Sequence, residues 1–215
     1  MTTVFSALAA DPAAPVEELA LAIAGAFRTV EADAVRDELD VLGNEVTARR
    51  GRGHPEGDVA ALASVLGDLH GFSGDEEDYD HPRNSFLDLV LARRRGLPIL
   101  LSVVYVACAS RAGIPLAGVG LPGHFVVGHL GTTPPLLLDP FAGGARVSVP
   151  GGTVQPWGAH VTALRMLNNL VGSYTRRGDL LAAIRAANLR LELPVEGADR
   201  DALAAEALGL QARLN

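Results

Sequence analysis

The amino-acid sequence predicts an α+β fold with helical segments at both ends. Two long stretches, about 15–70 and 159–215, carry apolar residues at helical spacing. Between them, short apolar and β-branched runs broken by glycine and proline indicate a small antiparallel sheet. With 215 residues, the chain suits one compact domain with an appendage, or two small domains.

The composition excludes several classes of function. The net charge is −7 and every basic residue is arginine, so lysine chemistry is excluded and a nucleic-acid or anionic-membrane partner is disfavoured. A single cysteine, Cys108, excludes an internal disulfide and a multi-cysteine metal site. We expect a cytoplasmic protein, because no secretory signal is visible and the most apolar stretch, 97–109, is shorter than the roughly 20 residues that cross a membrane.

The first helical stretch is interrupted by the polar segment ARRGRGHPEGD. We expect the arginines of this segment, Arg49, Arg50 and Arg52, to be solvated at the surface. The acidic connection that follows, 73–83, has no periodicity. It also lacks the alternating ligands and central glycine of a calcium loop, so no calcium site is predicted there.

Two helices should follow the acidic connection. FLDLVLARRRG predicts a helix with Asn84 or Ser85 as its N-cap and Gly96 as its C-terminal stop. The next helix begins at Pro98, has an almost wholly apolar body and ends before Gly113. A helix that is apolar on nearly every side should run through the interior.

The strand signals lie in IPLAGVGLPGHFVVGHL and PPLLLDPF, and ARVSVPGG could add one more strand. Helical texture then returns at 159–215. The spacing of five residues in this tail is close to that of a tetratricopeptide-like helix pair: Leu170, Tyr174, Gly178, Ala183 and Pro194. We therefore predict an N-terminal helical segment over 1–70, a core over 71–158 and a helical tail over 159–215 that packs back on the core.

No metal or cofactor site is expected. None of the six histidines has the HExxH spacing, and no phosphate-binding glycine motif follows a strand. One ordered set does suit acyl-transfer chemistry: a helix that starts near Pro98, a strand with His124 and a strand that ends at Asp139. A nucleophile at such a helix start would be activated, the histidine would act as base and the acid would orient it. The alternative is a core histidine and an aspartate in a turn.

The block from Gly71 to Asp179 resembles the SirB-type branch of the transglutaminase-like superfamily. The resemblance rests on NSFL, RRGLPILLS, GIPLAGVGLPGHF, LLDPF and RMLNNLVGSYTRRGD in this order. It implies a transglutaminase-like (papain-like cysteine-proteinase) core, with His124 and Asp139 at the family's catalytic positions. Active members carry a GxC motif at the start of the core helix. Here the motif reads GLP, so Pro98 stands in the nucleophile's place.

Two other residues on this helix carry a nucleophilic atom, but only one of them lies near the start of the helix. Cys108 lies ten residues beyond Pro98, about 15 Å along a helix axis, and is expected in the core. Ser102 lies one turn after Pro98 on nearly the same face and is an alternative nucleophile. Arg83 and Asn84 could line the same cleft as binding residues together with Pro98, or could cap a helix and face solvent.

The sequence therefore favours a non-catalytic, pseudoenzyme-like protein. Its degenerate cleft would bind a peptide or protein partner, and the helical tail offers a second docking surface. The competing hypothesis is an acyl-transfer or amide-hydrolysing enzyme that uses His124 and Asp139 with Ser102 or a water molecule as nucleophile. A third is a scaffold whose cleft is vestigial.

Overall fold

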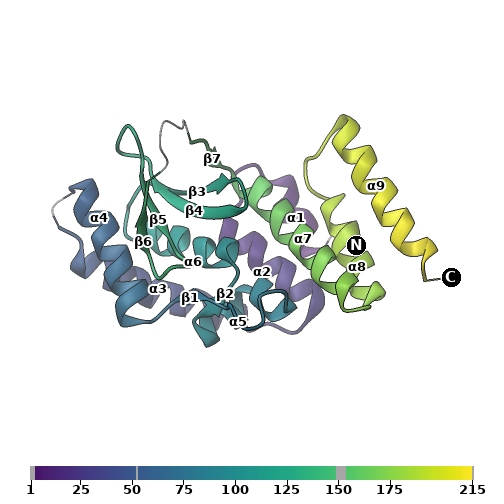
Figure 1. Ribbon diagram of the computed structural model, residues 1–215, viewed down its shortest axis with the longest axis horizontal. Coiled ribbons are helices and arrows are strands. Elements are labelled where there is room, and N and C mark those ends of the chain that lie inside the picture. Colours follow the sequence, from purple (N-terminus) through teal and green to yellow (C-terminus); the bar gives the residue numbers. More distant parts are fainter. Residues whose placement is uncertain (1–2, 52, 149–153, 215) are drawn as a thin grey trace.

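One buried helix, α6 (Pro98–Arg111), lies between a five-stranded sheet and a layer of helices (Figure 1). The structure is a computed structural model that describes residues 3–51, 53–148 and 154–214. The predicted α+β class is confirmed. The remaining helices are α1 (Val4–Ala10), α2 (Val16–Phe27), α3 (Ala32–Arg49), α4 (Pro55–Leu62), α5 (Leu87–Arg93), α7 (Ala159–Arg176), α8 (Leu180–Arg190) and α9 (Gly197–Ala212).

The main sheet is antiparallel, with the strand order β6-β5-β4-β3-β7. Its members are β3 (Leu116–Leu121), β4 (His124–His129), β5 (Leu136–Asp139), β6 (Ala145–Val147) and β7 (Pro156–Trp157). The sheet follows the predicted strand signals, although residues 149–152 of ARVSVPGG lie outside the described residues. A short parallel pair, β1 (Ser73–Gly74) and β2 (Arg95–Gly96), was not predicted.

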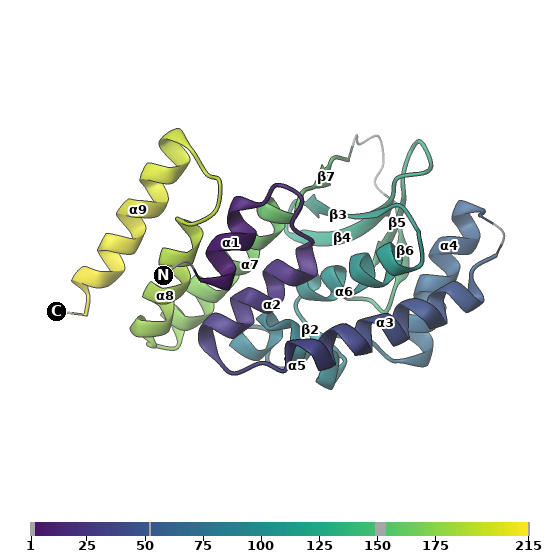
Figure 2. The same cartoon turned by 180° about the vertical axis from the view of Figure 1, so that it is seen from behind.

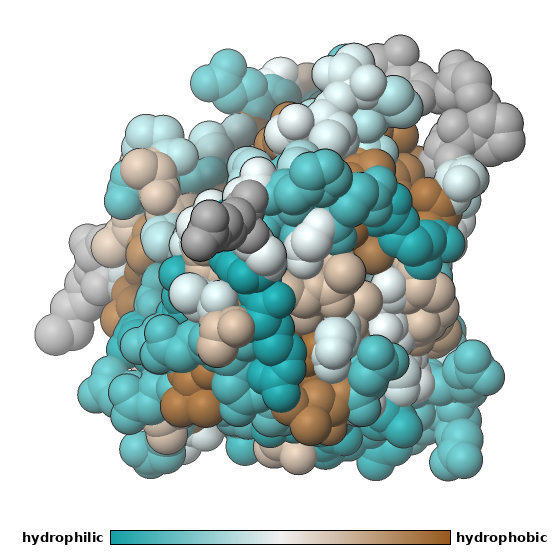
Figure 3. Space-filling view, turned by 90° about the vertical axis from the view of Figure 1, so that its left-hand side faces the viewer, coloured by the Kyte–Doolittle hydropathy of each residue, from teal (hydrophilic) through white to brown (hydrophobic). Residues whose placement is uncertain are grey.

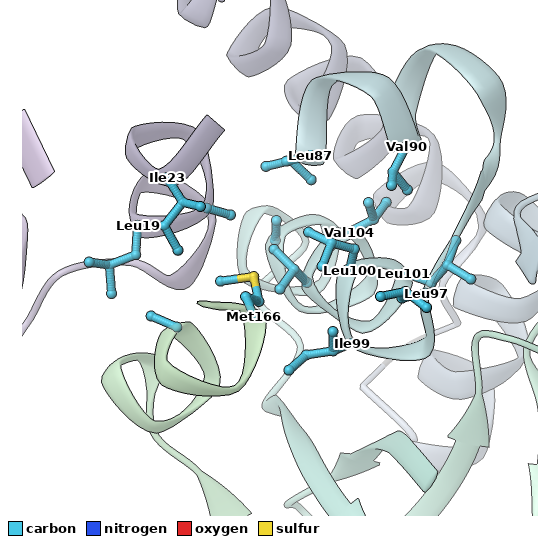
Figure 4. Packing of buried hydrophobic residues seen from close by; sticks show 14 of the residues in the cluster. Leu19, Ile23, Leu87, Val90, Leu97, Ile99, Leu100, Leu101, Val104 and Met166 are labelled. Atoms are coloured by element: carbon cyan, nitrogen blue, oxygen red, sulfur yellow. The ribbon is translucent and has the colours of Figure 1, made fainter. Parts of the chain in front are cut away.

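The hydrophobic core is built around α6. Leu100, Leu101 and Val104 are fully buried. Figure 4 shows them among side chains of α2, α5 and α7, including Leu87 and Met166. The apolar pattern of α6 on all sides is thereby explained, because neighbours contact it from every direction. On the far side of the sheet, a second and smaller cluster consists of Val119, Val126 and Leu137.

The helical tail packs back on the rest of the chain through α7, as expected. Met166 and Leu167 of α7 belong to the main core cluster, and Tyr174 stacks on Phe27 of α2 with ring centroids 5.6 Å apart. Figure 2 shows α9 as the outermost element at this end. At the opposite end, beside α4, the surface is mainly hydrophilic with small separate hydrophobic areas (Figure 3).

The prediction for the helix after the acidic connection was wrong at both ends. Asn84 and Ser85 lie in a 3-10 turn, η2 (Pro82–Ser85), and the N-cap of α5 is Phe86. The helix ends at Arg93 because Arg94 adopts a left-handed conformation with φ 58°. Gly96 pairs in β2 instead, and a Cβ there would lie 2.7 Å from the Val90 side chain, so this glycine permits close packing.

The expected solvation of the arginines in the polar segment is also wrong for Arg50. Its Nε donates to Asp58 Oδ1 over 2.9 Å, and Nη1 donates to the carbonyl of Ala112. Arg49 is exposed as expected and pairs with Glu45, whereas Arg52 lies outside the described residues. A buried acceptor at Asp58 draws Arg50 inward, which the local sequence does not reveal.

The chain after α4 continues as a π-helix, η1 (Ala63–Leu69), not as an ordinary α-helix. Here Gly67 lies against the backbone of the β5–β6 connection, and a Cβ on Gly67 would be 1.8 Å from the carbonyl oxygen of Gly143. Neither backbone can move aside easily.

Gly67→Ala is therefore expected to destabilise the protein by roughly 3 kcal/mol, because two backbone segments must separate. Gly25→Ala is the matched control: this glycine lies in α2, where an added Cβ would have nothing within 4 Å, so we expect a gain of ~0.5 to 1 kcal/mol. Urea unfolding of both variants measures the difference. Equal stabilities would contradict the close approach.

Candidate functional site

The start of α6 is fixed by its first residues. Pro98 occupies the first turn, where its missing N–H costs no helical hydrogen bond. Leu97, the N-cap, has no side chain that can accept from the helix amides. Its own N–H donates to the carbonyl of Asn84 over 3.1 Å, which ties the helix start to η2.

His124 and Asp139 form a hydrogen-bonded pair on neighbouring strands. A two-residue turn, Pro122 and Gly123 with φ 71° at the glycine, places His124 at the first residue of β4. Nε2 of His124 donates to Oδ2 of Asp139 over 2.9 Å, and Oδ1 of Asp139 accepts from the N–H of Phe141. Because the carboxylate can only accept, the proton lies on Nε2 and leaves Nδ1 as a basic nitrogen.

His124 and Pro98 line one cavity of about 360 Å³, which we call the His124 cleft. Its lining residues come from the β3–β4 turn, the start of α6 and α7, among other segments. Its other lining residues are Tyr79, Ile99, Gly120, Leu121, Pro122, Gly123, Phe125, Trp157, Arg165 and Asn169. The cleft thus unites a base held by an acid with a helix start that carries no nucleophilic atom.

The two other candidates on α6 do not enter this cleft. Ser102 is buried, lines a separate cavity of about 340 Å³, and its Oγ has no hydrogen-bond partner among the described residues. Phe125 and Trp157 line both cavities and lie between them, with ring centroids 5.3 Å apart. Cys108 is fully buried, and burial raises the pKa of its thiol to about 12.

Arg83 and Asn84 do not line the His124 cleft. Asn84 is fully buried, where its amide donates to the carbonyl of Asp78 over 2.8 Å and its Oδ1 accepts from Arg93. Arg83 lies 3.5 Å from the carboxylate of Asp75. Both side chains hold the acidic connection in shape.

Asp75 is the carboxylate at the centre of this connection. Burial would raise the pKa of Asp75, but hydrogen bonds from Arg93, the Asp78 N–H and Asn84 outweigh it and lower the pKa below the usual range. Because the folded-state pKa is lowered, this stabilisation is present above the unfolded pKa and is lost as the pH falls through the folded one.

Several residues of the site were missed by sequence reasoning. Arg165 and Asn169 are four residues apart on α7 and reach the cleft from the helical tail. Their i, i+4 spacing within RMLNN was a usable signal, because such residues share one helix face. Trp157 carried no signal beyond being the single tryptophan.

A buried polar network outside the cleft was also missed. Asp58 accepts from Arg50 and, over 3.3 Å, from Nε2 of His129. The Nδ1 of His129 accepts from the N–H of Gly131, which fixes the neutral tautomer. His124 and His129 are five residues apart along β4, so their side chains point to opposite faces of the sheet, and each has its own carboxylate partner.

The described part of the chain contains no group of three or more histidine, cysteine or acidic side chains placed to hold a metal ion. Nor does any of its helices combine the length and apolar character that crossing a bilayer requires.

Comparison with known proteins identifies one family and several relatives that match over part of their length. A model of the transglutaminase-like superfamily matches residues 33–151. Two bacterial relatives are each called UPF0162 protein. The one from Xylella fastidiosa is 45% identical over 86 residues, 40% of this chain and 31% of the relative. The one from Vibrio cholerae is 35% identical over 128 residues, 57% of this chain and 46% of the relative.

A similar stretch occurs in human F-box only protein 21, which is 32% identical over 138 residues, 55% of this chain and 22% of the relative. This chain therefore matches less than half the length of each of these relatives. No solved structure matches it significantly.

Proposed function

Because the chain belongs to the transglutaminase-like superfamily, we propose that it is a non-catalytic member of the SirB type that binds a peptide or protein partner in the His124 cleft. One observation carries the proposal: proline stands at the helix start beside an otherwise complete base and acid. Proline has no nucleophilic atom, so the covalent step of acyl transfer has no protein group to begin it.

The shape of the cleft supports a binding role. Aromatic side chains from two separate elements, Tyr79 and Trp157, line it beside the polar groups of His124 and Asn169. Aromatic surfaces with a few polar groups are typical of peptide-binding sites. That a similar stretch occurs within F-box only protein 21, a much longer chain, supports a module that works in different protein contexts.

The finer organisation belongs to the same proposal. We keep the division into 1–70, 71–158 and 159–215, and a tetratricopeptide-like tail as a second docking surface. Support for the tail comes from α7 and α8, which pack on each other around Gly178 with φ 75°, with Leu170 and Ala183 fully buried. A cytoplasmic setting accords with a single free thiol.

Peptides selected from a random library on the purified chain test the proposal. Trp157 is the only tryptophan and lines the cleft, so its fluorescence should change saturably with peptide concentration. Asn169→Phe, which fills the cleft, should weaken binding about tenfold or more. Leu181→Phe on the exposed side of α8 is the control and should bind as the unchanged protein does. Equal binding by both variants, or the absence of any binder, would refute the proposal.

The intact His124–Asp139 pair favours a second candidate, an acyl-transfer or amide-hydrolysing enzyme. Because Ser102 lines the other cavity, this candidate depends on a water molecule activated by Nδ1 of His124. It requires turnover of a peptide or acyl substrate that disappears in His124→Ala while the fold persists. Turnover that survives in His124→Ala would rule this mechanism out.

A further inference from the structure

The lining of the His124 cleft contains a basic residue and no acidic one, although the protein as a whole carries a net negative charge. The chain holds 25 acidic residues against 18 arginines, yet none of the twelve cleft-lining residues is acidic. Asp139 is adjacent, but its carboxylate is engaged by His124 and by the N–H of Phe141. The cleft therefore presents a cation and an imidazole inside an otherwise acidic molecule.

Arg165 supplies that cation, and it is exposed on α7. Twelve of the described arginines pair with a carboxylate within 4.0 Å, and three more donate to backbone carbonyls. Across 3–51, 53–148 and 154–214, Arg165 and Arg213 are the two with neither kind of contact. Of these two, Arg165 lines the His124 cleft, whereas Arg213 lies at the C-terminal end of α9.

We propose that the His124 cleft recognises an acidic side chain, aspartate or glutamate, of an extended peptide, which pairs with Arg165 while its neighbours contact Tyr79 and Trp157. This inference rests on the proposed function and names the partner's chemistry. A guanidinium donates two parallel hydrogen bonds to a carboxylate, which makes such a pair both strong and directional.

A side chain within the peptide suits the cleft better than a terminal carboxylate. The aromatic walls come from separate elements, Tyr79 from the connection before α5 and Trp157 from β7. A residue inside a peptide has neighbours in both directions that can contact the two walls, whereas a terminal residue has neighbours in one direction only.

Three random hexapeptide libraries test the inference. Two are acetylated and amidated and differ only in a central glutamate or glutamine, and the third has neutral side chains and a free terminal carboxylate. Trp157 fluorescence and calorimetry should show about tenfold tighter binding of the glutamate library than of the glutamine library. Since the protein carries a net charge of −7, non-specific attraction works against this result.

Matched arginine variants locate the preference. Arg165→Gln should abolish the preference for glutamate, and Arg165→Lys should retain part of it. Arg213→Gln makes the same change of charge at the end of α9 and should leave the preference intact. An unchanged circular dichroism spectrum and melting temperature show that each variant is folded.

Each other outcome overturns a specific statement. If the glutamate and glutamine libraries bind equally, the cleft does not recognise an acidic side chain, although it still binds peptides. If the third library binds most tightly, the group that the cleft recognises is a terminal carboxylate and not an acidic side chain. An equal loss in Arg213→Gln shows that Arg165 is not the recognising group. If none of the three libraries binds, the proposed function, peptide binding in the His124 cleft, is itself refuted.

Discussion

Replacing Pro98 with cysteine should create a thiol that alkylates at pH 7 at least about tenfold faster than an ordinary exposed thiol. The new side chain would stand at the start of α6 in the same cavity as His124. The helix N-terminus and a nearby imidazolium both stabilise a thiolate, so the pKa of this cysteine should fall below about 8.5. Iodoacetamide labelling followed against pH measures both the rate and the pKa.

Two controls make this experiment decisive. Leu181→Cys places a thiol on the exposed surface of α8 and should titrate normally. Pro98→Cys combined with His124→Ala should lose much of the rate gain, because the imidazole is removed. Cys108 should stay unlabelled in all variants until the protein unfolds, since it is fully buried. A Pro98→Cys thiol that behaves like the Leu181→Cys thiol would show that position 98 does not face the base.

The largest expected loss of stability comes from Asp58→Ala. Asp58 is buried and accepts from Arg50 and His129, so its removal leaves one partly buried guanidinium and one buried imidazole without this acceptor. Breaking a buried pair in this way costs about 3–5 kcal/mol. The network joins α4 to the end of α3, to β4 and, through Arg50, to Ala112 after α6, so the loss should appear as a lower unfolding midpoint in urea.

Glu56→Ala on the same helix is the matched control. Glu56 pairs with Arg146 at the surface, where both side chains are about half exposed. Exposed pairs contribute about 0–1 kcal/mol, so this variant should unfold nearly as the unchanged protein does. If the Asp58 and Glu56 variants lost equal stability, the buried network would contribute no more to the free energy of unfolding than an exposed ion pair does.

The central helix could be predicted closely from the sequence because its signals are local. Pro98 fixes the first turn, and the left-handed conformation of Gly113 follows the end of α6. The same approach failed for α5. Asn84 there donates to carbonyls of the acidic connection instead of capping the helix, and this choice depends on the burial of the whole connection. The π-helix depends on the β5–β6 backbone, which no local pattern encodes.

The candidate site also contains residues that the sequence indicated and residues that it did not. The order of Pro98, His124 and Asp139 along the chain suggested a base–acid pair beside a helix start but left a core histidine and a turn aspartate as the alternative, and the family resemblance favoured the pair. Arg165 was missed because α7 was treated as part of a separate tail, although its i, i+4 spacing with Asn169 placed both residues on one helix face. Ser102 shares nearly the same helical face as Pro98, but Phe125 and Trp157 lie between its cavity and the cleft. Helical spacing alone cannot show that side chains from other elements separate two residues on one helix face.

The most direct test of a binding cleft without turnover combines occupancy with mass. A selected peptide is incubated with the protein at concentrations that saturate the change in Trp157 fluorescence, and the masses of peptide and protein are then measured. We expect both masses to stay unchanged over hours while the cleft remains occupied. A shortened or hydrolysed peptide, or an acyl adduct on the protein, that disappears in His124→Ala would contradict the account and establish the cleft as an active site.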